Sequence, residues 1–135
     1  MHVIEQNPFY EAYYDAAHKF LIFSVTGDVE VTRIRSYLAR QIEWSQEHKV
    51  LGICADLTNL EGTIAPLSGF IATEYIAPLK ELGMSGAAIV VSEEILSRLA
   101  ARDFVKRMGE QGVVMFHDST DAMKWLHHRI QNHKQ

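Results

Sequence analysis

The N-terminal part of the chain has two short runs that are rich in apolar and aromatic side chains, as β-strands are. The first run covers Phe9 to Tyr14 and the second Lys19 to Thr26, with a short polar connection between them. This arrangement predicts a hairpin. From Phe20 to Val25 successive apolar side chains point to opposite faces, so we expect this strand inside a sheet that helices cover on both sides.

A helical period begins after Gly27 and Asp28. Apolar residues recur there at spacings of three and four, which predicts one buried stripe on a helix that ends near His48. The stripe consists of Val31, Ile34, Leu38 and Ile42. The next run, Val50 to Leu57, is short and apolar with β-branched residues, and it favours a buried strand.

A second helix is predicted from Pro66 to the stop signal at Gly83, because a proline fits the first turn of a helix. Its apolar positions at helical spacing are Leu67, Ile71, Tyr75, Leu79 and Leu82. Pro78 interrupts this stretch. Proline inside a helix removes a hydrogen bond and clashes with the carbonyl four residues back, so we expect a kink or an early end there.

The C-terminal part continues the alternation of strands and helices. Ala87 to Val91 and Val113 to Phe116 are predicted strands, and Ser92, followed by two glutamates, caps a helix between them that ends at Gly112. A final helix begins near Asp118, Ser119 or Thr120 and buries Ala122 or Met123, Leu126 and Ile130.

The predicted order is therefore ββαβαβαβα, which indicates an α/β protein with an open, mostly parallel five-stranded sheet and helices on both faces. We expect residues 1–135 to form a single domain, because no linker, repeat or change in composition divides the chain.

Composition and charge exclude several classes of function. The formal net charge is −4 and positive residues are scattered, which argues against nucleic-acid binding. The longest apolar run, Ala87 to Val91, is too short to span a membrane. The chain has one cysteine, Cys54, and a start without a signal-peptide pattern, so we expect a cytoplasmic protein of bacterial type.

Candidate catalytic and metal-binding residues do not assemble into known motifs. The histidines of the last helix, His127, His128 and His133, lack the spacing of three or four that places ligands on one helix face. Ser68, Ser92 and Cys54 stand outside nucleophile motifs, and the glycines match no phosphate-binding loop. We therefore expect no enzyme, no metal site and no cofactor.

The loop after the third predicted strand is the strongest candidate binding site. In open α/β sheets, ligands and partners dock where a strand leads into a helix N-terminus. The alternative is a plain connection in which Asp56 or Asn59 fixes a turn and Gly62 is left-handed. The candidate residues of this loop are Thr58, Asn59, Glu61, Gly62, Thr63, Ala65 and Ser68.

Three segments together resemble the STAS domain family, in particular its stand-alone SpoIIAA-like members, which are anti-sigma-factor antagonists. They are Gly27-Asp28, the run from Val50 into Asp56-Leu57-Thr58-Asn59-Leu60, and Asp121-Ala122-Met123-Lys124-Trp125-Leu126. The resemblance covers nearly the whole chain by element order. It implies an open βα superhelix and a switch in which a serine at the start of the second helix is phosphorylated.

Aligned on Asp56, the family's acceptor position falls on Ala65, or on Leu67 with a short insertion, and neither residue has a hydroxyl. We therefore expect a non-enzymatic regulatory module that docks a protein partner through this loop without the serine switch. The alternative is a small apolar-ligand or lipid carrier similar to SEC14-type domains, using Phe70, Tyr75 and nearby methionines. The aromatic run Phe9 to Tyr14, as an edge strand, either supports self-association or is covered, and the sequence leaves both open.

Overall fold

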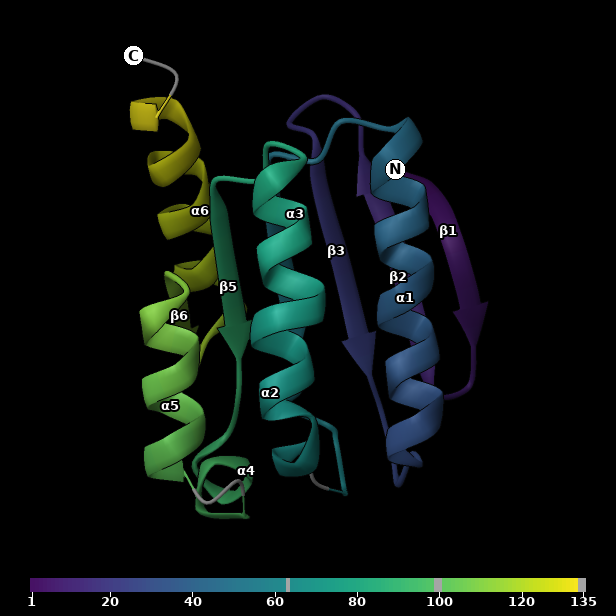
Figure 1. Cartoon of the computed structure of the whole chain (residues 1–135), viewed down its shortest axis with the longest axis vertical. Coiled ribbons are helices and arrows are strands. Elements are labelled where there is room, and N and C mark those ends of the chain that lie inside the picture. The colour runs from purple at the N-terminus through teal and green to yellow at the C-terminus, as the bar shows by residue number, and fades with distance from the viewer. Residues whose placement is uncertain (63, 99–100, 134–135) are drawn as a thin grey trace.

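The computed structural model describes residues 1–62, 64–98 and 101–133, and its centre is a six-stranded mixed sheet with the strands in chain order. β1 and β2 pair antiparallel, as do β2 and β3, whereas β3 to β6 are parallel to one another (Figure 1). The strands are β1 (His2–Asn7), β2 (Tyr10–Asp15), β3 (Phe20–Val25), β4 (Gly52–Asp56), β5 (Gly86–Val90) and β6 (Val113–Phe116).

The α/β class and the hairpin of β2 and β3 agree with the sequence prediction, but the predicted five strands are wrong because β1 adds a sixth. The run Phe9 to Tyr14 is consequently an inner strand, and β1 covers its free edge. β1 lacks a continuous apolar face, and the pairing shifts register between Val3 and Glu5. Pairing with β2, which the local pattern of β1 does not encode, therefore accounts for this strand.

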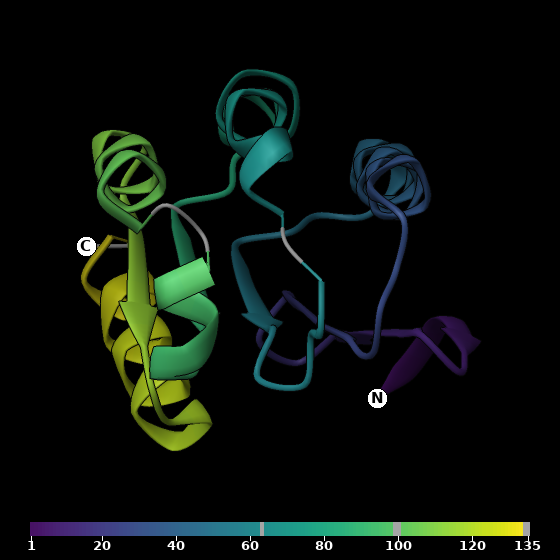
Figure 2. The same ribbon diagram turned by 90° about the horizontal axis from the view of Figure 1, so that it is seen from below.

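The helices lie on both faces of the sheet, unequally distributed (Figure 2). Among the described residues, three helices cover one face of the sheet. The first is α1 (Val31–Glu47) and the last is α5 (Ala101–Glu110). The helix between them is built from η1 (Ala65–Leu67), α2 (Ser68–Phe70), η2 (Ile71–Ile76) and α3 (Ala77–Glu81). α6 (Ser119–His133) covers β4, β5 and β6 on the other. In the described part of the chain, no helix is both long and apolar enough to cross a membrane.

The helix expected between Ser92 and Gly112 is divided into α4 (Glu93–Arg98) and α5, which point in different directions (Figure 1). Residues 99–100 between them lie outside the described part. The cap prediction holds, because the backbone N–H of Ile95 donates to Ser92 Oγ over 3.2 Å. In α6, Asp118 is the cap, since its Oδ1 accepts from the Thr120 N–H over 2.6 Å.

Pro78 does not end its helix, so the early end that the sequence offered as one outcome is wrong, and the helix instead changes its hydrogen-bond pattern beside the proline. The turn before it, η2, is a π-helix, in which the Ala77 N–H donates to the carbonyl of Ala72, five residues back. Pro78 thus stands in the first turn of α3, directly after the π-turn. The wider turn lets one continuous helix run on to Glu81.

Apolar side chains form two layers, one on each face of the sheet. The larger lies under α1, η2 and α5 and includes Leu21, Phe23 and Val25 of β3. The smaller lies under α6 and contains Phe20 with the α6 stripe of Ala122, Leu126 and Ile130. The alternation predicted for β3 is therefore confirmed, and both layers hold the carboxyl ends of β3 to β6 at a single edge.

Candidate functional site

The loop after β4 lies against the loop after β3 at the carboxyl edge of the parallel strands, and main-chain hydrogen bonds join them. The Gly27 N–H donates to the carbonyl of Asn59, and the Glu61 N–H donates to the carbonyl of Gly27, each over 2.9 Å. Gly27 and Leu60 form an isolated parallel bridge. Gly27 has a φ of 86°, which favours glycine, so this residue permits the contact.

A short polar turn begins the loop after β4. Asp56 Oδ1 accepts hydrogen bonds from the N–H of Thr58 over 3.0 Å and from the Thr58 hydroxyl over 2.6 Å. Asp56 therefore fixes the turn, as the sequence predicted for Asp56 or Asn59. Gly62 is not left-handed, which corrects the other half of that expectation. It is instead a close-approach position, because a Cβ there would lie 3.1 Å from Asp28 Oδ1.

The candidate residues differ in exposure. Asn59 and Glu61 are exposed, whereas Thr58, Gly62, Ala65 and Ser68 are half-buried, the last two in the first turns of the η1–α2 helix. Thr63, the remaining candidate, lies outside the described residues. The polar side chains that the structure places at the surface of this loop are therefore Asn59 and Glu61.

The positions where the STAS resemblance puts an acceptor serine belong largely to the core. Leu67 has a relative exposure of 6% and belongs to the main apolar layer. Ala65 is half-buried and carries no hydroxyl. At Leu67, a phosphorylated serine would place charge in an apolar layer, which is costly without paired cations.

Acidic side chains gather along this edge of the sheet, which Figure 2 shows from below. The segments that follow the carboxyl ends of the parallel strands are residues 26–30, 57–64, 91–94 and 117–121, and they contain no lysine or arginine. Their exposed carboxylates are Asp28, Glu30, Glu61, Glu93, Glu94, Asp118 and Asp121. We call this set, together with Asn59, the carboxyl-edge surface.

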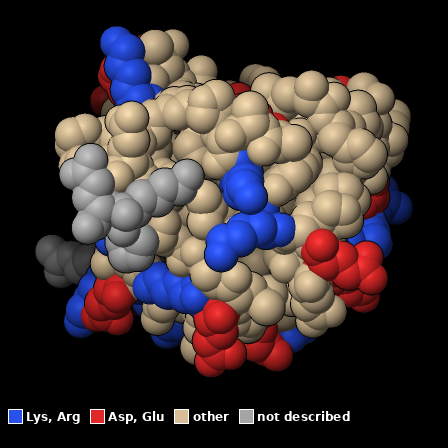
Figure 3. All heavy atoms as spheres, turned by 90° about the horizontal axis from the view of Figure 1, so that it is seen from above, with Lys and Arg blue, Asp and Glu red and all other residues tan. Residues whose placement is uncertain are grey.

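The opposite end of the molecule differs in charge. Lysine and arginine side chains stand near the middle of that end, with acidic side chains towards its margin (Figure 3). Lys19 and Lys49 belong to the segments that precede β3 and β4, and Arg129 Nε donates to the carbonyl of Ser85 over 3.2 Å. That end therefore carries both signs of charge, whereas the segments that follow the strands at the carboxyl edge carry carboxylates without lysine or arginine.

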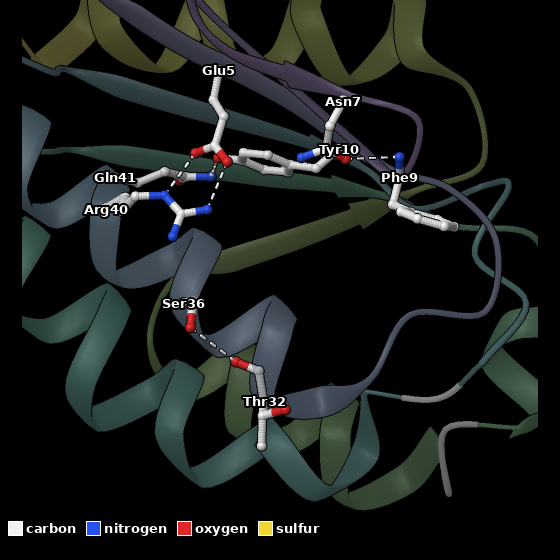
Figure 4. A network of polar contacts seen from close by, with 8 residues as sticks. All are labelled: Glu5, Asn7, Phe9, Tyr10, Thr32, Ser36, Arg40 and Gln41. Atoms are coloured by element: carbon white, nitrogen blue, oxygen red, sulfur yellow. Dashed lines mark hydrogen bonds and ion pairs between the residues drawn. The ribbon is translucent and has the colours of Figure 1, made fainter.

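An open groove of about 650 Å³ lies between the β1–β2 hairpin and α1. Arg40 spans it with two hydrogen bonds to the Glu5 carboxylate, of 2.8 and 2.6 Å (Figure 4). Near the carboxyl edge, the guanidinium of Arg33 lies 5.6 Å from the centre of the Phe9 ring. Phe9 is 38% exposed, so this end of the groove presents an aromatic ring beside the carboxyl-edge surface. No local pattern predicts this groove, because its two walls come from segments that are separate in the chain.

Beneath the groove, a buried polar chain connects β2, α1 and η2. Gln41 Nε2 donates to the Tyr10 hydroxyl over 2.8 Å, and the Tyr75 hydroxyl donates to Gln41 Oε1. Tyr10 stacks on Tyr37 with ring centres 4.1 Å apart. Burial raises the pKa of both Tyr10 and Tyr75 above the usual tyrosine value, so both hydroxyls stay protonated. The buried face of α1 thus differs from the predicted stripe, because Gln41 is buried while Ile42 is only half-buried, and Gln41 joins β2 to η2 through its hydrogen bonds.

The apolar interior has little free space. A cavity of about 50 Å³ lies between the sheet and its covering helices, lined by Phe23, Leu38, Tyr75 and other core residues. Pockets for small-molecule ligands are typically about 300 Å³ or larger. The packed structure therefore holds no space of the size an acyl chain requires in this layer.

The candidate nucleophiles occupy structural positions. Burial, followed by the nearby Asp56 carboxylate, raises the pKa of the Cys54 thiol to about 11, so the reactive thiolate is scarce at neutral pH. Ser92 Oγ is engaged as the cap of α4. Within the described residues, no group of three or more histidine, cysteine, aspartate or glutamate side chains is placed to hold a metal ion.

Comparison with models of known protein families and with curated proteins finds no match for this chain.

Proposed function

We propose that this protein is a non-enzymatic binding module whose carboxyl-edge surface docks a partner protein that presents a basic surface. The observation that carries this proposal is the pair of joined loops after β3 and β4. Main-chain bonds from Gly27 to Asn59 and Glu61 hold the two loops together, so the loop backbones need little ordering on binding. A preorganised surface loses less entropy when a partner docks.

Charge defines the kind of partner. The segments along this edge carry exposed carboxylates without lysine or arginine. Such a surface attracts a partner with exposed lysine and arginine residues, and it accelerates encounter at low ionic strength. The adjoining ring of Phe9 adds the kind of aromatic contact that is enriched at the centres of protein interfaces.

The same geometry disfavours the apolar-ligand alternative, because the interior cavity of about 50 Å³ would have to expand several-fold to admit a lipid tail. The absence of a hydroxyl at Ala65 and Leu67, and the burial of Leu67, support docking without a serine switch at the family's position. The resemblance to STAS domains, which rests on the element order and three short motifs, supports a regulatory partner.

A photo-crosslinking experiment tests the proposal. A benzophenone amino acid is placed at Asn59 and, as control, at Gln46, which is exposed near the opposite end of α1. The chain is expressed in its native cells, and crosslinked species are identified by mass spectrometry. We expect a specific protein adduct from Asn59 that is absent from Gln46, and its identified partner carries a basic surface.

Charge reversal provides the second arm of the test. The double variant Asn59→Lys/Glu61→Lys should weaken binding of the purified partner at least tenfold, and the wild-type affinity should fall as salt rises. The matched control is Gln46→Lys/Glu47→Lys, which changes net charge equally at exposed positions. Equal adducts from both crosslinker positions, or unchanged partner affinity in the Asn59/Glu61 variant, would refute the proposal.

A further inference from the structure

Two histidines that are far apart in the sequence meet near the end of the molecule opposite the carboxyl-edge surface. His18 stands in the turn between β2 and β3, and His127 stands on α6. Their ring centres are 4.5 Å apart and the rings are nearly perpendicular, at 84°. The turn is shaped by Lys19, whose φ of 62° is uncommon for a residue with a side chain. The spacing of histidines along α6 alone could not reveal this pair.

Asp15 orients the first of these rings. Its Oδ2 lies 2.8 Å from His18 Nδ1, while its Oδ1 accepts from the backbone N–H groups of Ala17 and His18 over 3.1 and 3.3 Å. These contacts fix the Asp15 carboxyl against the turn and set the orientation of the His18 ring. When Nδ1 donates to a carboxylate, the Nε2 lone pair of the same ring is left available, as in carboxylate–histidine–metal arrangements.

Space for an ion exists beside the pair. A surface pocket of about 260 Å³ is lined by Ala17, His18, Phe20, His127, Ile130 and Gln131. Zinc–nitrogen bonds of about 2.0–2.1 Å put the centre of a bound imidazole ring roughly 3.2 Å from the ion. Two bound rings would have centres about 5.2 Å apart at the tetrahedral N–metal–N angle usual for zinc, and about 4.5 Å apart at the 90° angle of octahedral coordination. The 4.5 Å between the rings of His18 and His127 fits an octahedral ion whose other ligands are mainly water.

We propose that His18 and His127 form a surface site for one divalent transition-metal ion of the class that prefers imidazole, with Asp15 positioning His18. Water, together with the amide oxygen of Gln131 on the pocket wall, completes the coordination. Such a site exchanges its ion readily, because only two strong protein ligands hold it. It is independent of the proposed docking function, which uses the other edge of the sheet.

The test is a titration of the full chain, without a histidine tag, with Zn²⁺ alone, followed by calorimetry and by NMR of the histidine rings. We expect saturable binding of one ion that shifts the ring signals of His18 and His127, with no response to Mg²⁺, which prefers oxygen ligands. The variant Asp15→Asn should bind about tenfold to a hundredfold more weakly. His18→Gln and His127→Gln should each lose more affinity than Asp15→Asn.

The matched control is His128→Gln. His128 neighbours His127 on α6, but its Nε2 lies 2.9 Å from Asn132 Nδ2 and it lines a different pocket. This variant should keep the wild-type affinity. Circular dichroism and thermal unfolding of each variant establish that it is folded before its affinity is compared. Zn²⁺ affinity unchanged in folded His18→Gln and His127→Gln, or reduced as much in His128→Gln, would overturn the assignment.

Discussion

The buried amide of Gln41 provides a quantitative test of how the sheet and the helices are held together. Gln41 is 1% exposed and is hydrogen-bonded to the hydroxyls of Tyr10 and Tyr75. Leucine has a similar volume but can partner neither hydroxyl. A buried polar group without a partner costs about 1–3 kcal/mol, so Gln41→Leu should lower the free energy of unfolding by about 2–6 kcal/mol.

The companion variant removes the whole polar chain. In Tyr10→Phe/Gln41→Leu/Tyr75→Phe no hydroxyl or amide of the set remains, and the ring of residue 10 can still stack on Tyr37. Replacing every member of a hydrogen-bonded group by apolar groups of the same shape is nearly neutral. We therefore expect this triple variant to lie within about 1 kcal/mol of the wild type, more stable than Gln41→Leu alone.

Urea unfolding, followed by tryptophan fluorescence, measures both variants, provided that the m-value stays unchanged. A triple variant as unstable as Gln41→Leu, or a Gln41→Leu protein as stable as the wild type, would refute the reasoning. Alkaline pH offers a second check. Because burial raises the folded-state pKa of Tyr10 and Tyr75, their contribution to stability is complete below their ordinary pKa of 10.0 and should decline above it.

Further predictions concern other parts of the molecule. Cys54, with its raised pKa of about 11 and its burial under α6, should resist thiol reagents at pH 8 in the folded protein and react once urea unfolds it; rapid native labelling would contradict this. Gly52→Ala should destabilise by about 1–3 kcal/mol, because the new Cβ would lie 3.0 Å from carbons of Phe20 and Leu126, and an unchanged urea midpoint would argue against that crowding. Glu5→Gln should cost at most about 1 kcal/mol, with the difference vanishing in 1 M salt, because the ion pair with Arg40 is partly exposed.

Local sequence patterns are sufficient to predict the elements whose apolar periodicity or capping is strong. The two apolar faces of β3 predicted covering layers on both sides, and the cap residues Ser92 and Asp118 marked the helix starts at α4 and α6. These features depend on neighbours within a few residues, which is the range over which periodicity and capping act. The loop from Asp56 to Ser68 could likewise be located from the alternation of strand and helix.

Other features depend on contacts between segments that are distant in the chain, and no local pattern predicts them. β1 is a strand because β2 offers it an edge, and the π-turn of η2 accommodates Pro78 within a packed helix. The buried partners of Gln41 and the meeting of His18 with His127 come from segments distant in the sequence. Such contacts form because the packing of helices on the sheet brings distant side chains together. Local periodicity in the sequence does not predict which of these side chains will meet.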